Sequence, residues 1–260
     1  MKSLRFFIKS LEMRFNEQSA YKLNFILRIL TLLSFDLMLP FITIMIYLQS
    51  KGFRAWSFNE ILMFQGMFIM VNSVDRMFFQ RVDWSLTQAV RTGYFDRYLL
   101  FPVNTLQYIS FTNFSLEQIV NFFIGLGLFI YSFIRLDFVP APIDIAVFSG
   151  CFVLALIFIY SVAILKYSLI VRAVRIGRLR EFLRTVKDYG RYPVDIYGSI
   201  MSSFFRYVIP LAVLSYYPTS ALIREPSENF LIVMIVILMI YFFSRFFWKN
   251  TLEQYTSAGG

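Results

Sequence analysis

The stretch IDIAVFSGCFVLALIFIYSVAILKYSLI, residues 143–170, is long and apolar enough to cross a membrane as one helix. A helix rises 1.5 Å per residue, so about 20 apolar residues cover the roughly 30 Å of hydrocarbon in a bilayer. Five further stretches share this character, at residues 23–47, 60–79, 105–133, 196–223 and 230–247. The sequence therefore predicts an all-α polytopic membrane protein with about six transmembrane helices, in a single domain over residues 1–260.

The composition supports a membrane protein and excludes several kinds of site. The chain is 58% hydrophobic and 16% charged, against roughly 45–50% and about 25% for soluble domains. Cys151 is the one cysteine and histidine is absent, so an intrachain disulfide, a Cys/His metal site and a histidine-based catalytic triad lack their residues. The chain also has no Gly-x-x-x-x-Gly-Lys-Ser/Thr phosphate loop. We therefore expect no catalytic residues, no metal and no cofactor bound by this chain.

The basic residues predict the orientation. They gather in the N-terminal segment, in residues 81–104 and 171–195, and in the C-terminal tail, while the loops on the other side hold only Lys51, Arg54, Arg135 and Arg224. Basic residues accumulate on the cytoplasmic side of membrane proteins, which places both termini in the cytoplasm of a multi-pass protein of the cell (inner) membrane. The net charge of +9 then indicates contact with membrane lipid, and nucleic acid is not an expected partner because no soluble basic domain is left to bind it.

Two cytoplasmic segments have a recognisable pattern besides their charge. In residues 1–22, Leu4, Ile8, Leu11 and Phe15 follow a helical spacing, which predicts an interfacial amphipathic helix on the inner membrane surface. A charged leader with no special role is the alternative. Residues 171–195 carry seven basic residues and are expected to form a basic cytoplasmic loop. Such a loop could dock on a soluble partner or bind anionic lipid, and charge alone favours lipid.

Residues 81–104, RVDWSLTQAVRTGYFDRYLLFPVN, predict a short amphipathic element at the cytoplasmic face. Leu86, Val90 and Tyr94 form an apolar stripe that could enter a groove on a partner protein. Gly93 can end a helix, and Pro102 prevents its continuation into the next span. A plain connecting loop that rests on lipid headgroups is the alternative.

Polar groups and prolines inside the spans mark a second set of candidates. Asp36 and Asn72 are the most central polar residues, and each could serve transport or form a structural hydrogen bond between helices. Pro210 and Pro218 predict that the fifth span is interrupted, because proline removes a backbone donor and clashes with the preceding turn. The break is expected to face a dimer partner or the cargo path. An ordinary proline kink is the alternative.

Two of these segments resemble a known family. VRTGYFDRYLLFPVN, residues 90–104, is similar to the region after the second span of type 2 ABC exporter permeases, and YPVDIYGSI with YVIPLAVLSYYPTSALI resembles their fifth-span signature. The resemblance implies six helices per subunit, paired into a twelve-helix dimer. The second permease copy can be identical, giving a homodimer, or a related permease, giving a heterodimer. It also implies a separate ABC ATPase subunit that binds ATP and Mg.

The resemblance further assigns roles to individual residues. The ATPase-coupling region would contain Arg91, Gly93, Asp96, Arg97, Leu99, Leu100 and Pro102. The outer half of the fifth span and its re-entrant turn would contain Pro210, Tyr216, Tyr217 and Pro218. One departure is the sequence IREP, residues 223–226, at a place where the family often has a small residue or glycine.

Three functions are compatible with a chain of this kind. The resemblance favours an export permease that works by alternating access and takes its energy from a partner ATPase. An ion-coupled secondary transporter or channel is the alternative, for which acidic residues near the membrane midplane and an internal repeat would be typical. A membrane-embedded enzyme acting on lipid is disfavoured, because the chain has no histidine and no clustered carboxylates.

Overall fold

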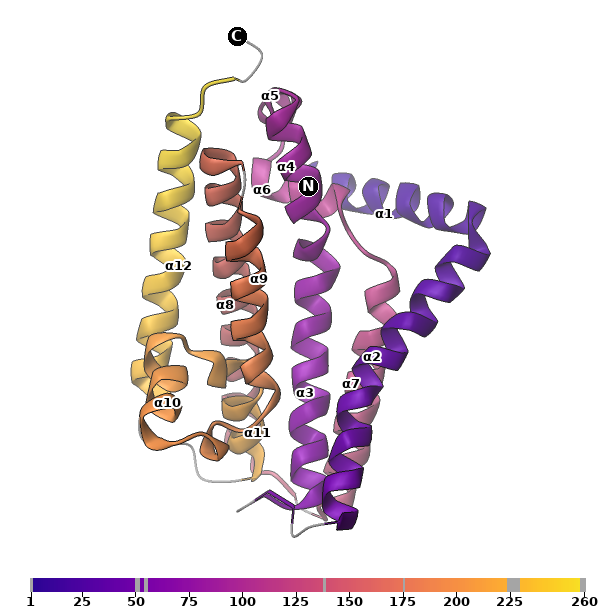
Figure 1. Ribbon diagram of the computed structural model, residues 1–260, viewed down its shortest axis with the longest axis vertical. Helices are drawn as coiled ribbons and strands as arrows, with labels where there is room; N and C mark the ends of the chain where they lie inside the picture. Colours follow the sequence, from indigo (N-terminus) through magenta and orange to yellow (C-terminus); the bar gives the residue numbers. More distant parts are fainter. Residues whose placement is uncertain are drawn as a thin grey trace.

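The computed structural model describes residues 2–49, 52–53, 56–137, 139–174, 176–223 and 230–257. Four basic residues of the charge comparison lie outside the described residues, namely Lys51, Arg54, Arg175 and Arg224. The part of the IREP sequence that follows Ile223 also lies outside them. Throughout the described parts every regular element is helical, which confirms the predicted all-α fold. The long helices form a bundle, and the two termini lie toward the same end of it (Figure 1).

Five long helices make up the bundle. They are α2 (Lys22–Gln49), α3 (Phe58–Asp75), α7 (Glu117–Arg135), α8 (Pro142–Ala173) and α12 (Phe230–Glu253). Among the described helices, α2, α7, α8 and α12 are long and apolar enough to cross a membrane, whereas α3 has 18 residues but carries more polar side chains. The reason is the position of α3 at the centre of the bundle, where every residue from Ile61 to Ser73 is buried. A helix enclosed by protein can carry polar side chains, and Gln65 donates a hydrogen bond to Thr43 of α2 over 2.5 Å.

Helices α3 and α7 approach each other through two glycines. A Cβ atom added at Gly66 would lie 2.7 Å from the carbonyl oxygen of Gly125, and one added at Gly125 would lie 2.8 Å from the carbonyl oxygen of Gly66. Real Cβ contacts are essentially never that short. Small residues therefore allow these two backbones to touch, as they do in many membrane helix pairs.

The third predicted span, residues 105–133, is two helices instead of one. Helix α6 (Thr105–Thr112) lies at the end of the bundle near the termini, and α7 begins only at Glu117. The break is fixed by side-chain and backbone hydrogen bonds: Asn113 Nδ2 donates to the carbonyl of Ile109 over 2.8 Å, and the Ser115 amide donates to Met77 over 2.9 Å.

The basic segment 171–195 contains a helix where a loop was expected. Helix α9 (Gly177–Asp188) runs along the bundle axis, away from the end that holds the termini (Figure 1). It continues into the short turns η2 (Tyr189–Arg191) and η3 (Val194–Ile196). A Cβ atom at Gly190 would lie 3.4 Å from the ring of Phe68, so the chain here has reached the middle of α3.

Residues 196–223, expected as one span, are divided into short pieces. These are α10 (Ser199–Ser203), the π-helical turn η4 (Phe204–Val208), the 3-10 turn η5 (Leu211–Leu214) and α11 (Tyr216–Ile223). The interruption falls at Ile209 and Pro210, in the region where the prolines predicted a break. All four residues of η5 are buried, so protein covers the irregular backbone there. In Figure 1 these pieces lie in the half of the bundle opposite the termini.

The N-terminal helix α1 (Lys2–Ala20) lies across the end of the bundle, nearly perpendicular to the long helices (Figure 1). Phe7 anchors it, with ring centroids 4.6 Å from Phe111 and 5.8 Å from Phe114. Of the predicted apolar stripe, Ile8 and Phe15 are exposed, whereas the side chain of Leu4 lies outside the described residues. An uncovered apolar stripe on a helix of this orientation is typical of an interfacial helix.

Candidate functional site

The predicted coupling segment forms two helices at the end of the bundle that holds the termini (Figure 1). Helix α4 (Val82–Arg91) ends where Gly93 adopts a positive φ of 71°, a conformation that glycine takes without strain. Helix α5 (Phe95–Leu100) follows, and Asn104 caps α6 by accepting a hydrogen bond from the Leu106 amide. Pro102 lies between α5 and α6, so it separates the two helices.

The apolar stripe of this segment is largely unavailable to a partner, which corrects the prediction. Leu86 is 0% exposed and Val90 is also buried, because α4 packs against α8. Tyr94 alone of the three remains exposed. The spacing of these residues indicated a helix correctly, but it did not distinguish a face that binds another protein from one that packs within this chain.

A different apolar edge is open at the end of α5. Leu100 is 83% exposed, and its neighbours Leu99 and Phe101 are exposed as well. Trp84, on α4, is a further exposed aromatic residue that the sequence reasoning did not select. Exposed apolar patches mark contacts with another protein or with a membrane.

The charged residues of the segment have local partners or face outward. Arg91 and Arg97 are exposed, and the Arg97 guanidinium lies 4.8 Å from the centre of the Tyr94 ring. Asp96 accepts a hydrogen bond from the hydroxyl of Ser257 over 2.6 Å. The C-terminal tail therefore contacts α5, and the ring of Tyr255 lies 5.0 Å from that of Phe95.

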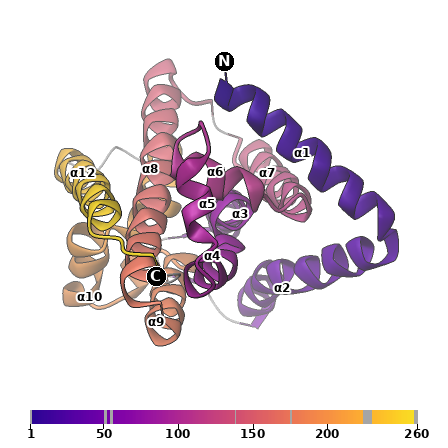
Figure 2. The same cartoon turned by 90° about the horizontal axis from the view of Figure 1, so that it is seen from above.

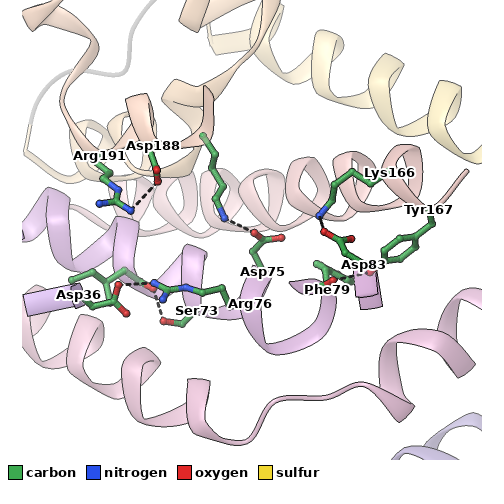
Figure 3. A network of polar contacts seen from close by, with 12 residues as sticks. Asp36, Ser73, Asp75, Arg76, Phe79, Asp83, Lys166, Tyr167, Asp188 and Arg191 are labelled. Atoms are coloured by element: carbon green, nitrogen blue, oxygen red, sulfur yellow. Dashed lines mark hydrogen bonds and ion pairs between the residues drawn. The ribbon is translucent and has the colours of Figure 1, made fainter. Parts of the chain in front are cut away.

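Asp36 belongs to a layer of ion pairs that joins the segment from α3 to α4 to its neighbours (Figure 3). Asp36 Oδ1 of α2 is 2.6 Å from Arg76 Nη2, at the start of the π-helical turn η1 (Arg76–Gln80) that links α3 to α4. Asn72 is buried on α3, one turn before Arg76, and its side-chain oxygen Oδ1 has no hydrogen-bond partner among the described residues. Asp36 therefore forms an ion pair between α2 and η1, a structural contact of the kind that the sequence left open beside a transport role.

Three more pairs extend this layer to other helices. Lys187 Nζ of α9 lies 2.5 Å from Asp75 Oδ2 of α3, and Lys166 Nζ of α8 lies 3.2 Å from Asp83 Oδ2 of α4 (Figure 3). Burial raises the pKa of the Asp83 carboxyl, and the charge of Lys166 opposes that rise. On the other side of the turn, Arg81 binds Glu117 of α7 over 2.6 Å. The segment from α3 to α4 is thus held by α2, α7, α8 and α9.

The residues of the helix break lie at the opposite end of the bundle from the coupling segment (Figure 1). Pro210, Tyr217 and Pro218 are buried, and Tyr216 is half-buried. The Tyr216 hydroxyl donates to Asp195 over 3.2 Å. The same carboxylate pairs with Arg206 at 2.5 Å and accepts from the Trp56 indole at 3.3 Å. The structure therefore places the two predicted groups of site residues far apart.

Comparison of the sequence with models of protein families identifies the family of this chain. The model of the ABC-2 family transporter proteins matches residues 30–259, which is most of the sequence. The chain belongs to the ABC-2 transporter family. No curated protein and no solved structure gives a match. The family match includes both the coupling segment and the helix break.

An ABC-2 permease is a membrane-embedded subunit of an ABC transporter, and the family is typically non-catalytic. The four apolar helices α2, α7, α8 and α12 agree with a location in a membrane. Among the described residues of this permease, no group of three or more His, Cys, Asp or Glu side chains could hold a metal ion.

Proposed function

We propose that this ABC-2 permease exports its cargo across the cell (inner) membrane, driven by a separate ABC ATPase that binds ATP and Mg. Two permease subunits, identical or related, would pair into the twelve-helix assembly. Closure of the ATPase dimer would push on the coupling segment and shift the permease pair between inward-open and outward-open states. The family match supports the permease role, and the exposed edge of α5 supports an ATPase contact.

The six crossings would be α2, α3, α7, α8, the segment from α9 through η3, and α12. Residues 177–196 would make the fifth crossing, because they run along the bundle past the middle of α3. The pieces from α10 to α11 would then form a re-entrant element in the outer half. Termini at one end of the bundle require an even number of crossings, and the basic residues favour the cytoplasm for that end.

Labelling of single cysteines should report this topology. On a Cys151→Ser background, a cysteine at Arg178 should react with a membrane-impermeant maleimide only after the cells are opened. A cysteine at Arg135, at the other end of α7, should react in intact cells and serves as the matched control. Reaction of the Arg178 position in intact cells would exclude the proposed orientation.

The observation that carries the coupling proposal is the exposed apolar edge Leu99, Leu100 and Phe101, with Arg91 and Arg97 beside it. An apolar edge with flanking charges can enter a groove on a partner while the charges set its register. Because Leu86 and Val90 are buried in this chain, the contact would be made by the end of α5 and the turn before α6.

Substitution at this edge should separate ATPase binding from membrane insertion. We expect Leu100→Asp to leave the amount of folded protein unchanged, because Leu100 is 83% exposed and contributes little to the packing of this chain. Loss of a central apolar anchor typically costs about 2 kcal/mol or more of binding free energy. Co-purification of the cognate ATPase with tagged permease should therefore fall about thirtyfold, and transport should fall with it.

Gln254→Asp is the control for the coupling experiment, since it adds the same charge at an exposed position directly after α12. It should bind the ATPase like the parent protein. If Leu100→Asp also binds the ATPase like the parent, the end of α5 is not the coupling site. If no ATPase co-purifies with the parent protein itself, the proposed energy source is wrong.

A further inference from the structure

A pocket lined by polar side chains together with Leu27 and Leu32 lies between α2, the turn from α3 to α4, and α7. It has a volume of about 530 Å³, which is in the range of roughly 300–1,000 Å³ found for small-ligand sites. Helix α2 forms one wall with Asn24, Arg28 and Thr31, which share a helical face. The other wall is Gln80, the last residue of η1, and Arg81, which precedes α4, together with Glu117 at the start of α7. Figure 2 shows α1 and α2 as an elbow that stands away from α7 on this side.

The charges of the pocket leave one cation without a counter-charge. Glu117 is satisfied at both oxygens, by Arg81 at 2.6 Å and by Gln18 of α1 at 3.1 Å. Arg28 forms no ion pair and no hydrogen bond with any of the described residues, and it is exposed to the pocket. The site therefore carries a net positive charge, with the amides of Asn24 and Gln80 as further donors.

The residues around the pocket indicate what kind of molecule would bring an anion to it. Next to Arg28 on α2, Leu23, Ile26 and Leu30 are exposed apolar residues, suited to acyl chains. Helix α1 lies across this end of the bundle with Ile8 and Phe15 uncovered, so the pocket is at the depth of an interface between lipid and water. Basic pockets between transmembrane helices on the cytoplasmic side bind anionic headgroups.

We propose that this pocket binds the phosphate headgroup of an anionic phospholipid from the adjacent leaflet, with Arg28 as its main charge partner. The acyl chains lie along the apolar face of α2. The bound lipid fills the space between the α1–α2 elbow and α7, and so holds the elbow in place. The proposal does not depend on export or on the ATPase, because Arg28, the main charge partner, lies on α2, outside the coupling segment.

Lipid retention by the purified permease tests this site. We expect the parent protein, incubated in detergent with equal amounts of phosphatidylglycerol and phosphatidylcholine, to retain phosphatidylglycerol preferentially in native mass spectrometry. Arg28→Gln should reduce that retention at least about fivefold, the factor expected for one arginine near an anionic surface. Arg28→Lys keeps the charge and should retain most of the binding. Arg28 was chosen over Arg81, whose loss would leave Glu117 without its cation.

The controls distinguish this pocket from general surface charge and from a site for free anions. Arg178→Gln removes an exposed arginine on α9 and should leave retention unchanged. A loss of equal size in Arg178→Gln, or unchanged retention in Arg28→Gln, would overturn the proposal. Inorganic phosphate without lipid should raise the melting temperature of the parent less than phosphatidylglycerol does. An equal rise, abolished by Arg28→Gln, would show that the pocket recognises free phosphate as well as it recognises the lipid, and would overturn the assignment to a phospholipid.

Discussion

Replacing Gly125 with alanine should destabilise the permease strongly, while the same change at Gly127, two residues further along α7, should not. The new Cβ at position 125 would lie 2.8 Å from both the Gly66 carbonyl oxygen and the Met70 amide nitrogen of α3. Backbone atoms of a central helix cannot rotate away as a flexible side chain would. The helices must separate instead, and overpacking of this kind typically costs about 1–3 kcal/mol, and occasionally more.

For alanine at Gly127, on the same helix, we expect no loss of stability. A Cβ atom there meets nothing within 4 Å, and alanine is more favourable than glycine inside a helix by about 1 kcal/mol. Gly127→Ala should therefore match the parent protein or exceed it in melting temperature, measured by thermal unfolding in detergent. Gly125→Ala should melt at a clearly lower temperature and give less monodisperse protein in size-exclusion chromatography. Equal melting temperatures for the two variants would mean that α3 and α7 do not cross at these glycines.

The sequence predicted those parts of the fold that have a local signal. Runs of apolar residues indicated α2, α8 and α12, and Pro210 indicated the interruption before η5. Helix α9 was missed because its apolar positions, Leu179, Leu183 and Val186, are separated by charged residues. Such a helix has no apolar run, so its position along the bundle depends on contacts with residues far away in the chain.

The sequence also located the coupling segment but not its exposed face. A stripe of apolar residues at helical spacing is the same pattern whether it packs on another subunit or on α8 of the same chain. Leu86 and Val90 are buried within this chain, where α4 packs against α8. The exposure of Leu100 has no signal in the spacing, because it arises from the sharp turn between α5 and α6 that leaves the end of α5 uncovered.

The ion pairs could not be predicted from the sequence, because their partners are far apart in the chain. Asp75 is the last residue of α3, and its partner Lys187 is 112 residues away in the chain. Nothing in either segment indicates the other without the fold. The pair is also the only direct ion pair between α9 and α3 in the described part of the chain, so it should have a large effect on stability.

Substituting Lys187 by methionine should destabilise the permease by about 3 kcal/mol, near the lower end of the about 3–5 kcal/mol typical when one partner of a buried pair is removed. The Asp75 carboxylate, whose side chain is 16% exposed, would keep its burial and lose its nearest cation. Arg184→Met is the matched control, because Arg184 is exposed on the same helix and its loss should change the melting temperature little.

The double variant Asp75→Leu with Lys187→Met tests whether the loss of stability comes from the unpaired carboxylate. Replacing both members of a buried pair by apolar residues is often neutral or stabilising, because no charge is left in the protein interior. We therefore expect the double variant to recover most of the melting temperature that Lys187→Met loses in detergent. Recovery would show that the cost comes from an isolated carboxylate and that α9 packs against α3 in the folded permease. If Lys187→Met melts like Arg184→Met, then Lys187 does not neutralise Asp75, and the position of α9 along the bundle is wrong.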